Sequence, residues 1–250
     1  MAYRRGKDLI NFSFFFRAVS RLVFSCLWPI AYLLVALLYS IRYEGHKKLR
    51  RLNGGAVLVS NHTAYLDPIM ISGAALPRLI YQTLLEATVE TPVLGTFTRL
   101  LGGVPLPPGM RGLEKLIETA KPAFRYRHFI HFYPEGELSL NSQRIERFKF
   151  GAFWAAAKLN LPVIPIVTII SEGGRRFHKR RLVVLDPFYP KDFIRHKEND
   201  SLDLDSVQSF AEAVRQAMQD EIDRRRTLNP KDGTHRYYQG KAARIRGINR

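Results

Sequence analysis

The chain is short of cysteine and of acidic side chains. Its 250 residues include a single cysteine, Cys26, which excludes an intrachain disulfide framework and fits a reducing compartment. Only 22 aspartates and glutamates stand against 39 lysines and arginines, so the formal net charge is +17. A charge of this size calls for a polyanionic partner such as nucleic acid, an anionic membrane surface or a phosphate-bearing substrate.

Several sequence signatures are missing as well. The chain has no Cys/His finger and no aromatic strand signature of an RNA-binding sheet, so we expect no specific nucleic-acid partner. It has no Gly-x-Ser-x-Gly turn, and therefore no predicted serine nucleophile of that type. No motif indicates a metal ion or an obligate protein partner, and no internal repeat or low-complexity linker is visible.

The longest apolar run lies near the N-terminus. Residues 22–41 carry no charged side chain, over a length close to that of a helix that crosses a bilayer. Pro29 leaves a kinked span or a re-entrant hairpin open, and basic residues flank both ends of the run. No small-residue cleavage site follows, which disfavours a signal peptide. We therefore expect residues 1–45 to anchor the protein in anionic lipid, at the cytoplasmic face of the inner or cell membrane.

Beyond residue 53, short apolar runs alternate with amphipathic stretches, which is typical of an α/β domain. The predicted fold is a mixed central sheet with helices on both faces, over residues 46–226. A basic tail, residues 227–250, is predicted as a second contact with anionic lipid. We expect strands at 56–60, 79–84, 103–106, 128–133, 163–170 and 182–185, and helices at 68–75, 92–101, 112–121, 148–159 and about 206–225.

A histidine and an aspartate, five residues apart, follow the first of these strands. A His62 ring held by Asp67 is the minimal device for removing a proton from an alcohol. A plainer interpretation has Asp67 capping a helix whose first residue is Pro68, with His62 in an ordinary loop. The spacing alone favours the cap. Both roles can coexist, because a carboxylate on the first turn can also orient a histidine ring.

A second polar cluster, from His131 to Glu137, follows another predicted strand. Ligands of open α/β sheets bind outside the carboxyl ends of the strands, so we expect this cluster and the His62 loop to open at one edge. Pro134 and Gly136 predict a tight turn that aims backbone N–H groups and two carboxylates into the crevice. By itself, a Pro-Glu-Gly sequence is more often only a turn.

Taken together, four blocks resemble the glycerolipid acyltransferases typified by 1-acylglycerol-3-phosphate acyltransferase. The blocks are Asn61-His62-x4-Asp67; Pro92, Gly95 and Gly102; Tyr133-Pro134-Glu135-Gly136 with Phe148-Lys149-Phe150-Gly151; and Val163-Ile164-Pro165-Ile166. The resemblance implies acyl transfer from an acyl-CoA or acyl carrier protein thioester to a lyso-lipid hydroxyl, with no other cofactor. It gives His62 the role of general base and Asp67 that of holding the ring. Substrate-binding roles fall to Asn61, Gly102, Glu135, Gly136 and Glu137.

The chain departs from this family where members with a phosphorylated acceptor carry cations. At the three positions where those family members carry cations, this chain has Leu85 or Glu86, Pro108 and Leu138. Arg111 and Lys149 are candidates to replace the lost cations. The expected acceptor is a lysophospholipid of the 1-acylglycerol-3-phosphate type, and the alternative is a lipid without a terminal phosphate.

Two further classes stay open. One is a hydrolase or transacylase that uses the same His/Asp pair on lipid esters. The other is a non-enzymatic basic adaptor for membrane or nucleic acid, in which the motifs are structural. Loss of acyl transfer in a His62→Ala variant with an intact fold separates the enzyme from the adaptor, whose salt-dependent binding would survive the change.

Overall fold

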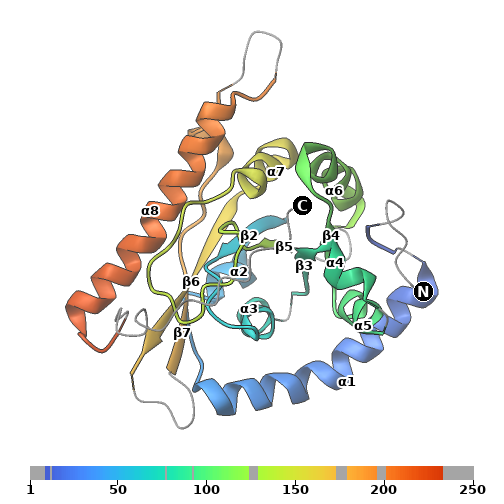
Figure 1. The fold of residues 1–250 in the computed structure, drawn as a ribbon, viewed down its shortest axis with the longest axis horizontal. Helices are drawn as coiled ribbons and strands as arrows, with labels where there is room; N and C mark the ends of the chain where they lie inside the picture. The colour runs from blue at the N-terminus through green and yellow to red at the C-terminus, as the bar shows by residue number, and fades with distance from the viewer. Residues whose placement is uncertain are drawn as a thin grey trace.

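The computed structural model describes residues 9–11, 13–76, 78–91, 93–123, 129–172, 179–195 and 201–232 (Figure 1). These residues build one seven-stranded sheet with the strand order β1-β7-β6-β2-β5-β3-β4. Strands β6 and β7 are antiparallel and the other neighbours are parallel, which confirms the predicted mixed sheet. The strands are β1 Arg42–Glu44, β2 Ala56–Ser60, β3 Ile80–Leu85, β4 Gly103–Leu106, β5 Phe129–Phe132, β6 Val163–Ser171 and β7 Lys179–Val184.

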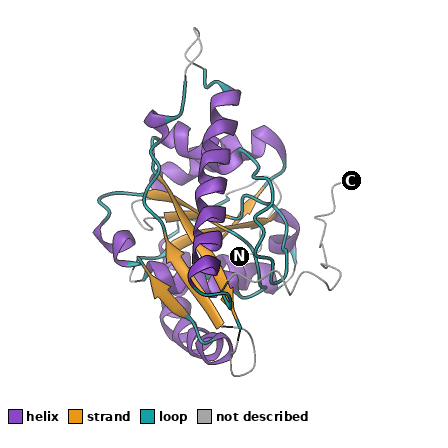
Figure 2. Cartoon of the chain, turned by 90° about the vertical axis from the view of Figure 1, so that its left-hand side faces the viewer, coloured by secondary structure: helices purple, strands orange, loops and turns teal. Residues whose placement is uncertain are grey.

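Both faces of the sheet are covered by helices, as predicted. Every residue of the central strand β2 is buried, because β2 has parallel neighbours on both sides and helices above and below. One hydrophobic core includes residues of α6 (Gly109–Ala123), α7 (Gly151–Leu159) and α8 (Leu204–Leu228), and the other includes residues of α3 (Asp67–Ala75). In Figure 2 the strands run through the middle of the molecule with helices around them. The carboxyl ends of β2 and β5 therefore open at one edge, between these two layers.

The sequence predicts the apolar strands and the long helix well, whereas it misses several short polar segments. Strands β2 and β4 have the predicted bounds, and the predicted core stripe of α8 (Val207, Phe210, Val214, Met218 and Ile222) is buried. The helix predicted from residue 148 begins at Gly151 instead, because residues 148–150 belong to the loop that packs on the Pro134 turn. The sequence analysis missed β1, α2 (Lys47–Arg51), α4 (Glu86–Glu90) and the 3₁₀ turn Pro190–Asp192. These segments are three to five residues long and depend on tertiary neighbours.

The N-terminal apolar run forms one helix, α1, from Phe14 to Tyr39. Pro29 lies inside the helix, so the hairpin alternative is wrong. In Figure 1, α1 runs along the lower edge of the domain, beneath α5 (Leu94–Leu100) and α3. It is long and apolar enough to cross a bilayer, and only 11% of its most apolar window is buried. The buried side chains are those of Phe16, Ser20, Phe24 and Val35.

The two predicted segment boundaries, after residues 45 and 226, each fall within packed structure. Residues 42–44, assigned to the anchor, form strand β1 and pair with β7. Helix α8 continues to Leu228, and Asp232, assigned to the tail, accepts a hydrogen bond from the Ser171 hydroxyl of β6. Residues 233–250 of the predicted lipid-binding tail lie outside the described residues, so the role of the tail stays a prediction.

Candidate active site

The loop that follows β2 is tied to the neighbouring strand by Asn61. Its side-chain amide donates to the carbonyl oxygen of Thr168 (3.1 Å), and its side-chain oxygen accepts from the Thr168 backbone N–H (2.8 Å). Asn61 is 3% exposed, so these bonds form in the interior. The sequence analysis assigned Asn61 to substrate binding, whereas these contacts fit a residue that positions the loop.

Replacing Asn61 with alanine should lower the free energy of unfolding by about 2 kcal/mol, because the buried Thr168 N–H loses its partner and the Thr168 carbonyl oxygen keeps only its bond from Gln143 Nε2 (3.2 Å). Urea denaturation of the two proteins measures this difference. Asn229→Ala, which truncates an exposed asparagine at the end of α8, is the matched control and should change stability by under about 1 kcal/mol. Equal effects of the two substitutions would contradict the positioning role.

His62 and Asp67 meet as the sequence predicts. The His62 ring nitrogen Nδ1 lies 3.0 Å from Asp67 Oδ2, and the same oxygen accepts hydrogen bonds from the backbone N–H groups of Thr63 and Ala64. Helix α3 is capped at Leu66 without a side-chain hydrogen bond, so the prediction that Asp67 is the N-cap is wrong. Asp67 is fully buried and His62 is 20% exposed. Asp67 Oδ2 accepts from Nδ1–H of the His62 ring. The other ring nitrogen, Nε2, therefore carries no proton and is the basic nitrogen of this partly exposed side chain.

One aromatic ring stacks on the His62 ring, and a second ring contacts the first. Tyr133 stacks on His62, with ring centroids 3.9 Å apart and an interplanar angle of 18°, and Tyr133 in turn meets the edge of His131. His131 is fully buried, and burial, assisted by the nearby His62, lowers its pKa to about 3. A neutral His131 donates from Nδ1 to Gln82 Oε1 (2.7 Å) and accepts at Nε2 from the Ser60 hydroxyl (2.9 Å). The His62 ring therefore stacks on Tyr133, which in turn contacts an uncharged His131.

The Pro-Glu-Gly turn lies beside the His62 loop, as expected. Glu135 is 7% exposed, and its carboxylate accepts from the backbone N–H groups of His62 (3.3 Å) and Glu146 (3.1 Å). Burial raises the pKa of Glu135 to about 7, although these two hydrogen bonds oppose the rise. Glu135 thus joins the His62 loop to the loop that contains Glu146, which fits a bracing residue, and its predicted role in substrate binding stays a prediction.

Stability should fall as the pH rises from 4.5 to about 7 because of Glu135. In this range the folded protein binds a proton that the unfolded chain has already released, so a rising pH favours unfolding. The contribution is fully present below pH 4.5, its loss is complete above about pH 7, and it amounts to about 3–4 kcal/mol. Urea denaturation across this range should show the decline in wild type relative to Glu135→Gln. His131 acts in the opposite direction in both proteins and cancels from the difference. Parallel stability curves would contradict the prediction.

Around Gly136 the backbone is in the left-handed region, with φ of +73°. Its N–H donates to the carbonyl oxygen of Tyr133 (3.0 Å), which closes the turn. The Gly136 N–H is therefore not one of the backbone N–H groups that the sequence analysis expects in the crevice. The Lys149 side chain lies so close that a Cβ on Gly136 would come within 2.5 Å of Nζ. The structure therefore brings the Lys149 cation to the turn, and it leaves Glu137, the next residue, half-buried beside it.

The remaining predicted residues lie farther away. Arg111 is exposed in the first turn of α6, after the carboxyl end of β4. Gly102 lines a different pocket, together with Arg99. Pro92 lies outside the described residues. The roles of Arg111 and Gly102 in substrate binding stay predictions.

Arg180 of β7 is a cation that the sequence analysis missed. It is 2% exposed, and its guanidinium donates to the Thr63 hydroxyl (2.7 Å) and to Asn141 Oδ1 (2.6 Å). The guanidinium also lies over the ring of Tyr39, the last residue of α1, at 5.2 Å from its centroid. Burial lowers the pKa of Arg180, while Asp67 and Tyr39 oppose that effect. Arg180 therefore supports the loop that carries the His/Asp pair.

Known proteins share this arrangement of sequence blocks and strands. Residues 40–169, more than half of the chain, match the model of the family described as Acyltransferase. The chain belongs to the Acyltransferase family. The crystal structure of the 1-acyl-sn-glycerophosphate (LPA) acyltransferase PlsC from Thermotoga maritima has a similar fold. Its TM-score is 0.52 at 20% identity, and the match covers 83% of this chain and 78% of that one.

Two curated relatives of this acyltransferase are named 1-acyl-sn-glycerol-3-phosphate acyltransferase. The chloroplastic LPAT1 of Arabidopsis thaliana is 31% identical over 54% of this chain and 37% of its own length. The protein of Saccharomyces cerevisiae is 27% identical over 66% of this chain and 55% of its own length. The chain thus spans between about a third and just over half of the length of these relatives.

Proposed function

We propose that this acyltransferase moves a fatty acyl group from a thioester, acyl-CoA or acyl carrier protein, to a hydroxyl of a lysophospholipid of the 1-acylglycerol-3-phosphate type. The observation that carries the proposal is the His62–Asp67 pair at 3.0 Å, with the carboxylate buried and the histidine partly exposed. The names of the relatives support the acceptor class. The thioester is a co-substrate, and we propose no further cofactor.

The chemistry follows from the tautomer. Nε2 of His62 removes the proton of the acceptor hydroxyl while the oxygen attacks the thioester carbonyl carbon, which forms a tetrahedral oxyanion. Asp67 holds the ring and stabilises the imidazolium that results. When the C–S bond breaks, the proton on Nε2 passes to the leaving thiolate. The Lys149 ammonium beside the Gly136 turn is our candidate for binding an acceptor phosphate.

We also propose that the enzyme works at a membrane surface, on the cytoplasmic face. The outer side of α1 exposes a row of large apolar side chains: Phe14, Phe15, Leu22, Leu27, Ile30, Leu33, Leu34 and Leu37. The opposite side packs on α3 and α5. A helix with one side on the protein and an apolar side exposed suits a position in the plane of one leaflet better than a transmembrane span. Anionic lipids complement the charge of +17.

A second acceptor class has a specific observation in its favour. At one of the three positions where the family's cations are missing, Leu138, the side chain is buried, 7% exposed. An apolar, buried residue at this position weakens phosphate binding. A lyso-lipid without a terminal phosphate is therefore the second candidate.

One experiment tests both the reaction and the acceptor. Purified full-length protein is given a panel of lyso-lipids with isotope-labelled acyl-CoA or acyl carrier protein, and the products are identified by mass spectrometry. We expect 1-acylglycerol-3-phosphate to be acylated with no free fatty acid released. A preferred acceptor without a terminal phosphate would select the second candidate. Release of labelled fatty acid without any acylated product would instead indicate a hydrolase.

A further inference from the structure

Three rings lie one behind another at the proposed base. The His62 ring covers the face of Tyr133, with ring centroids 3.9 Å apart and an interplanar angle of 18°. Tyr133 meets His131 at a centroid distance of 4.5 Å and an angle of 88°. Neutral aromatic pairs prefer offset or edge-to-face arrangements, with centroids about 4.5–7 Å apart. The contact between His62 and Tyr133 is closer and nearly parallel, which suits a pair in which one ring becomes charged.

His62 changes its charge during the proposed reaction. The ring is neutral before it takes the proton of the acceptor hydroxyl, and it is an imidazolium afterwards. The face of an aromatic ring is negative because of the ring quadrupole, and it attracts a cation that lies within about 6 Å of the centroid. At 3.9 Å, the face of Tyr133 attracts the imidazolium more strongly than the neutral ring. The contact therefore favours the state in which His62 holds the proton.

Tyr133 acts on His62 through its ring and not through its hydroxyl. The hydroxyl is buried and has no hydrogen-bond partner among the described residues. Burial holds the pKa of Tyr133 well above its usual range, and the nearby Asp67 adds to this effect, so the side chain stays neutral. A buried hydroxyl without a partner destabilises the fold. The feature of Tyr133 that the site uses is therefore the aromatic face.

His131 lies on Tyr133 without adding a charge. Burial, with a smaller contribution from His62, lowers the pKa of His131 to about 3, so its ring stays neutral. Hydrogen bonds to Ser60 of β2 and Gln82 of β3 fix the orientation of this ring. A charged His131 would compete for Tyr133 and repel the imidazolium, whereas the neutral ring only holds Tyr133 in place.

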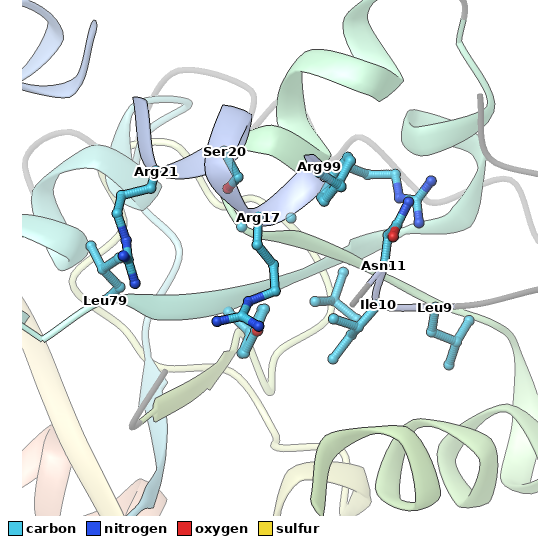
Figure 3. A pocket seen from close by; sticks show the side chains of 13 residues that line it. Leu9, Ile10, Asn11, Arg17, Ser20, Arg21, Leu79 and Arg99 are labelled. Atoms are coloured by element: carbon cyan, nitrogen blue, oxygen red, sulfur yellow. The ribbon is translucent and has the colours of Figure 1, made fainter. Parts of the chain in front are cut away.

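Other charged groups also act on His62. They come from α3, from the turn after β5 and from β7, and they are Asp67, Glu135 and Arg180. Asp67, and Glu135 when it is ionised, favour a positive ring, whereas Arg180 opposes it. Three further cations lie where β3 and β4 begin, at the opposite ends of the strands, and Figure 3 labels them: Arg17, Arg21 and Arg99. A change of the ring at position 133 leaves all of these groups in place.

We propose that Tyr133 is a positioning residue that stabilises the His62 imidazolium through a cation–π contact, and that the neutral His131 fixes the Tyr133 ring for this purpose. The inference rests on the proposed role of His62 as the general base. Tyr133 makes His62 a stronger base than Asp67 alone would make it. The contact is strongest after the proton has moved from the acceptor hydroxyl to Nε2, so it lowers the barrier of that step.

Two rings of similar shape at position 133 test the proposal. Tyr133→Phe keeps the negative face, whereas pentafluorophenylalanine at the same position reverses the quadrupole of the ring. The readout is the titration midpoint of the His62 ring, followed by NMR in the full-length protein without substrates, and the His62→Gln protein identifies its signal. We expect Tyr133→Phe to keep the midpoint within about 0.3 pH unit of wild type. The fluorinated ring should lower the midpoint by about one pH unit, because the cation is no longer favoured.

Rates of acyl transfer complete the test. Relative to Tyr133→Phe, the fluorinated ring should lower kcat/KM by about three- to tenfold and move the acidic limb of its pH profile to lower pH. The matched control is pentafluorophenylalanine in place of Phe153, a buried ring of α7 that packs on Phe148 and Phe210, and it should leave the midpoint and the rate unchanged.

The outcomes separate this inference from the proposed function. Equal midpoints for the two rings at position 133 would overturn the cation–π contact and leave Tyr133 as a packing residue. A lowered midpoint with equal rates would overturn its part in the reaction. A lowered midpoint in a protein that transfers no acyl group would support the contact and overturn the proposed function instead.

Discussion

Replacing His62 with glutamine should lower kcat for acyl transfer by about 10²–10⁴-fold, because the acceptor hydroxyl then loses the general base that takes its proton. Glutamine fills a similar volume, and the support beneath it, Tyr133 and the buried His131 network, does not depend on the charge of residue 62. The protein should therefore keep its circular dichroism spectrum and its melting temperature within a few degrees. Initial rates with labelled thioester and lyso-lipid measure the loss.

His46→Gln is the matched control. His46 precedes α2 and is partly exposed, on a segment remote in sequence from the proposed site, so the same chemical change there should leave kcat within about twofold. A His62→Gln protein that keeps wild-type rates would remove the general base from the mechanism. The motifs of the chain would then be structural, as in the adaptor hypothesis.

Asparagine in place of Asp67 should damage both catalysis and folding. Asp67 Oδ2 accepts from the His62 ring and from two backbone N–H groups, and an amide nitrogen at that position would face three donors. We expect kcat to fall by about 10²–10⁴-fold because the His62 tautomer is no longer fixed. The free energy of unfolding should fall by about 3 kcal/mol because buried donors lose a charged acceptor. Kinetics and urea denaturation of the same preparation give the two values.

Asp205→Asn provides the comparison for Asp67→Asn. Asp205 also lies in the first turn of a helix, α8, but it is exposed, so its substitution should alter stability by less than about 1 kcal/mol. If Asp67→Asn lost stability but kept its rate, Asp67 would be a purely structural residue.

The sequence predicted the parts of the site that depend on local patterns. A continuous apolar run gave β2 its correct bounds, and the order of four sequence blocks, rather than the five-residue spacing alone, predicted the contact between His62 and Asp67. The Pro134–Gly136 turn was predicted from residue types with strong conformational preferences.

Contacts between distant segments could not be read from the sequence in the same way. The Asn61 amide finds its partner 107 residues away on β6, and Arg180 reaches Thr63 across 117 residues. No periodicity specifies which strands become neighbours, so the pairing of β6 with both β2 and β7 had to be observed. The expectation that the N–H groups of this turn point into the crevice fails at Gly136 for a related reason, since that N–H closes its own turn.

The contact between Tyr39 and Arg180 joins the end of α1 directly to the loop that carries His62 and Asp67. Helix α1 ends at Tyr39, Ser40 turns the chain in the left-handed conformation, and β1 enters the sheet at Arg42. The Tyr39 ring covers the same guanidinium that holds Thr63. A domain on a flexible tether samples many heights and tilts above a bilayer. In the proposed membrane-bound state, the Tyr39–Arg180 contact ties the position of the His62 loop to that of α1, so the fold itself would set the depth at which a lipid hydroxyl meets His62.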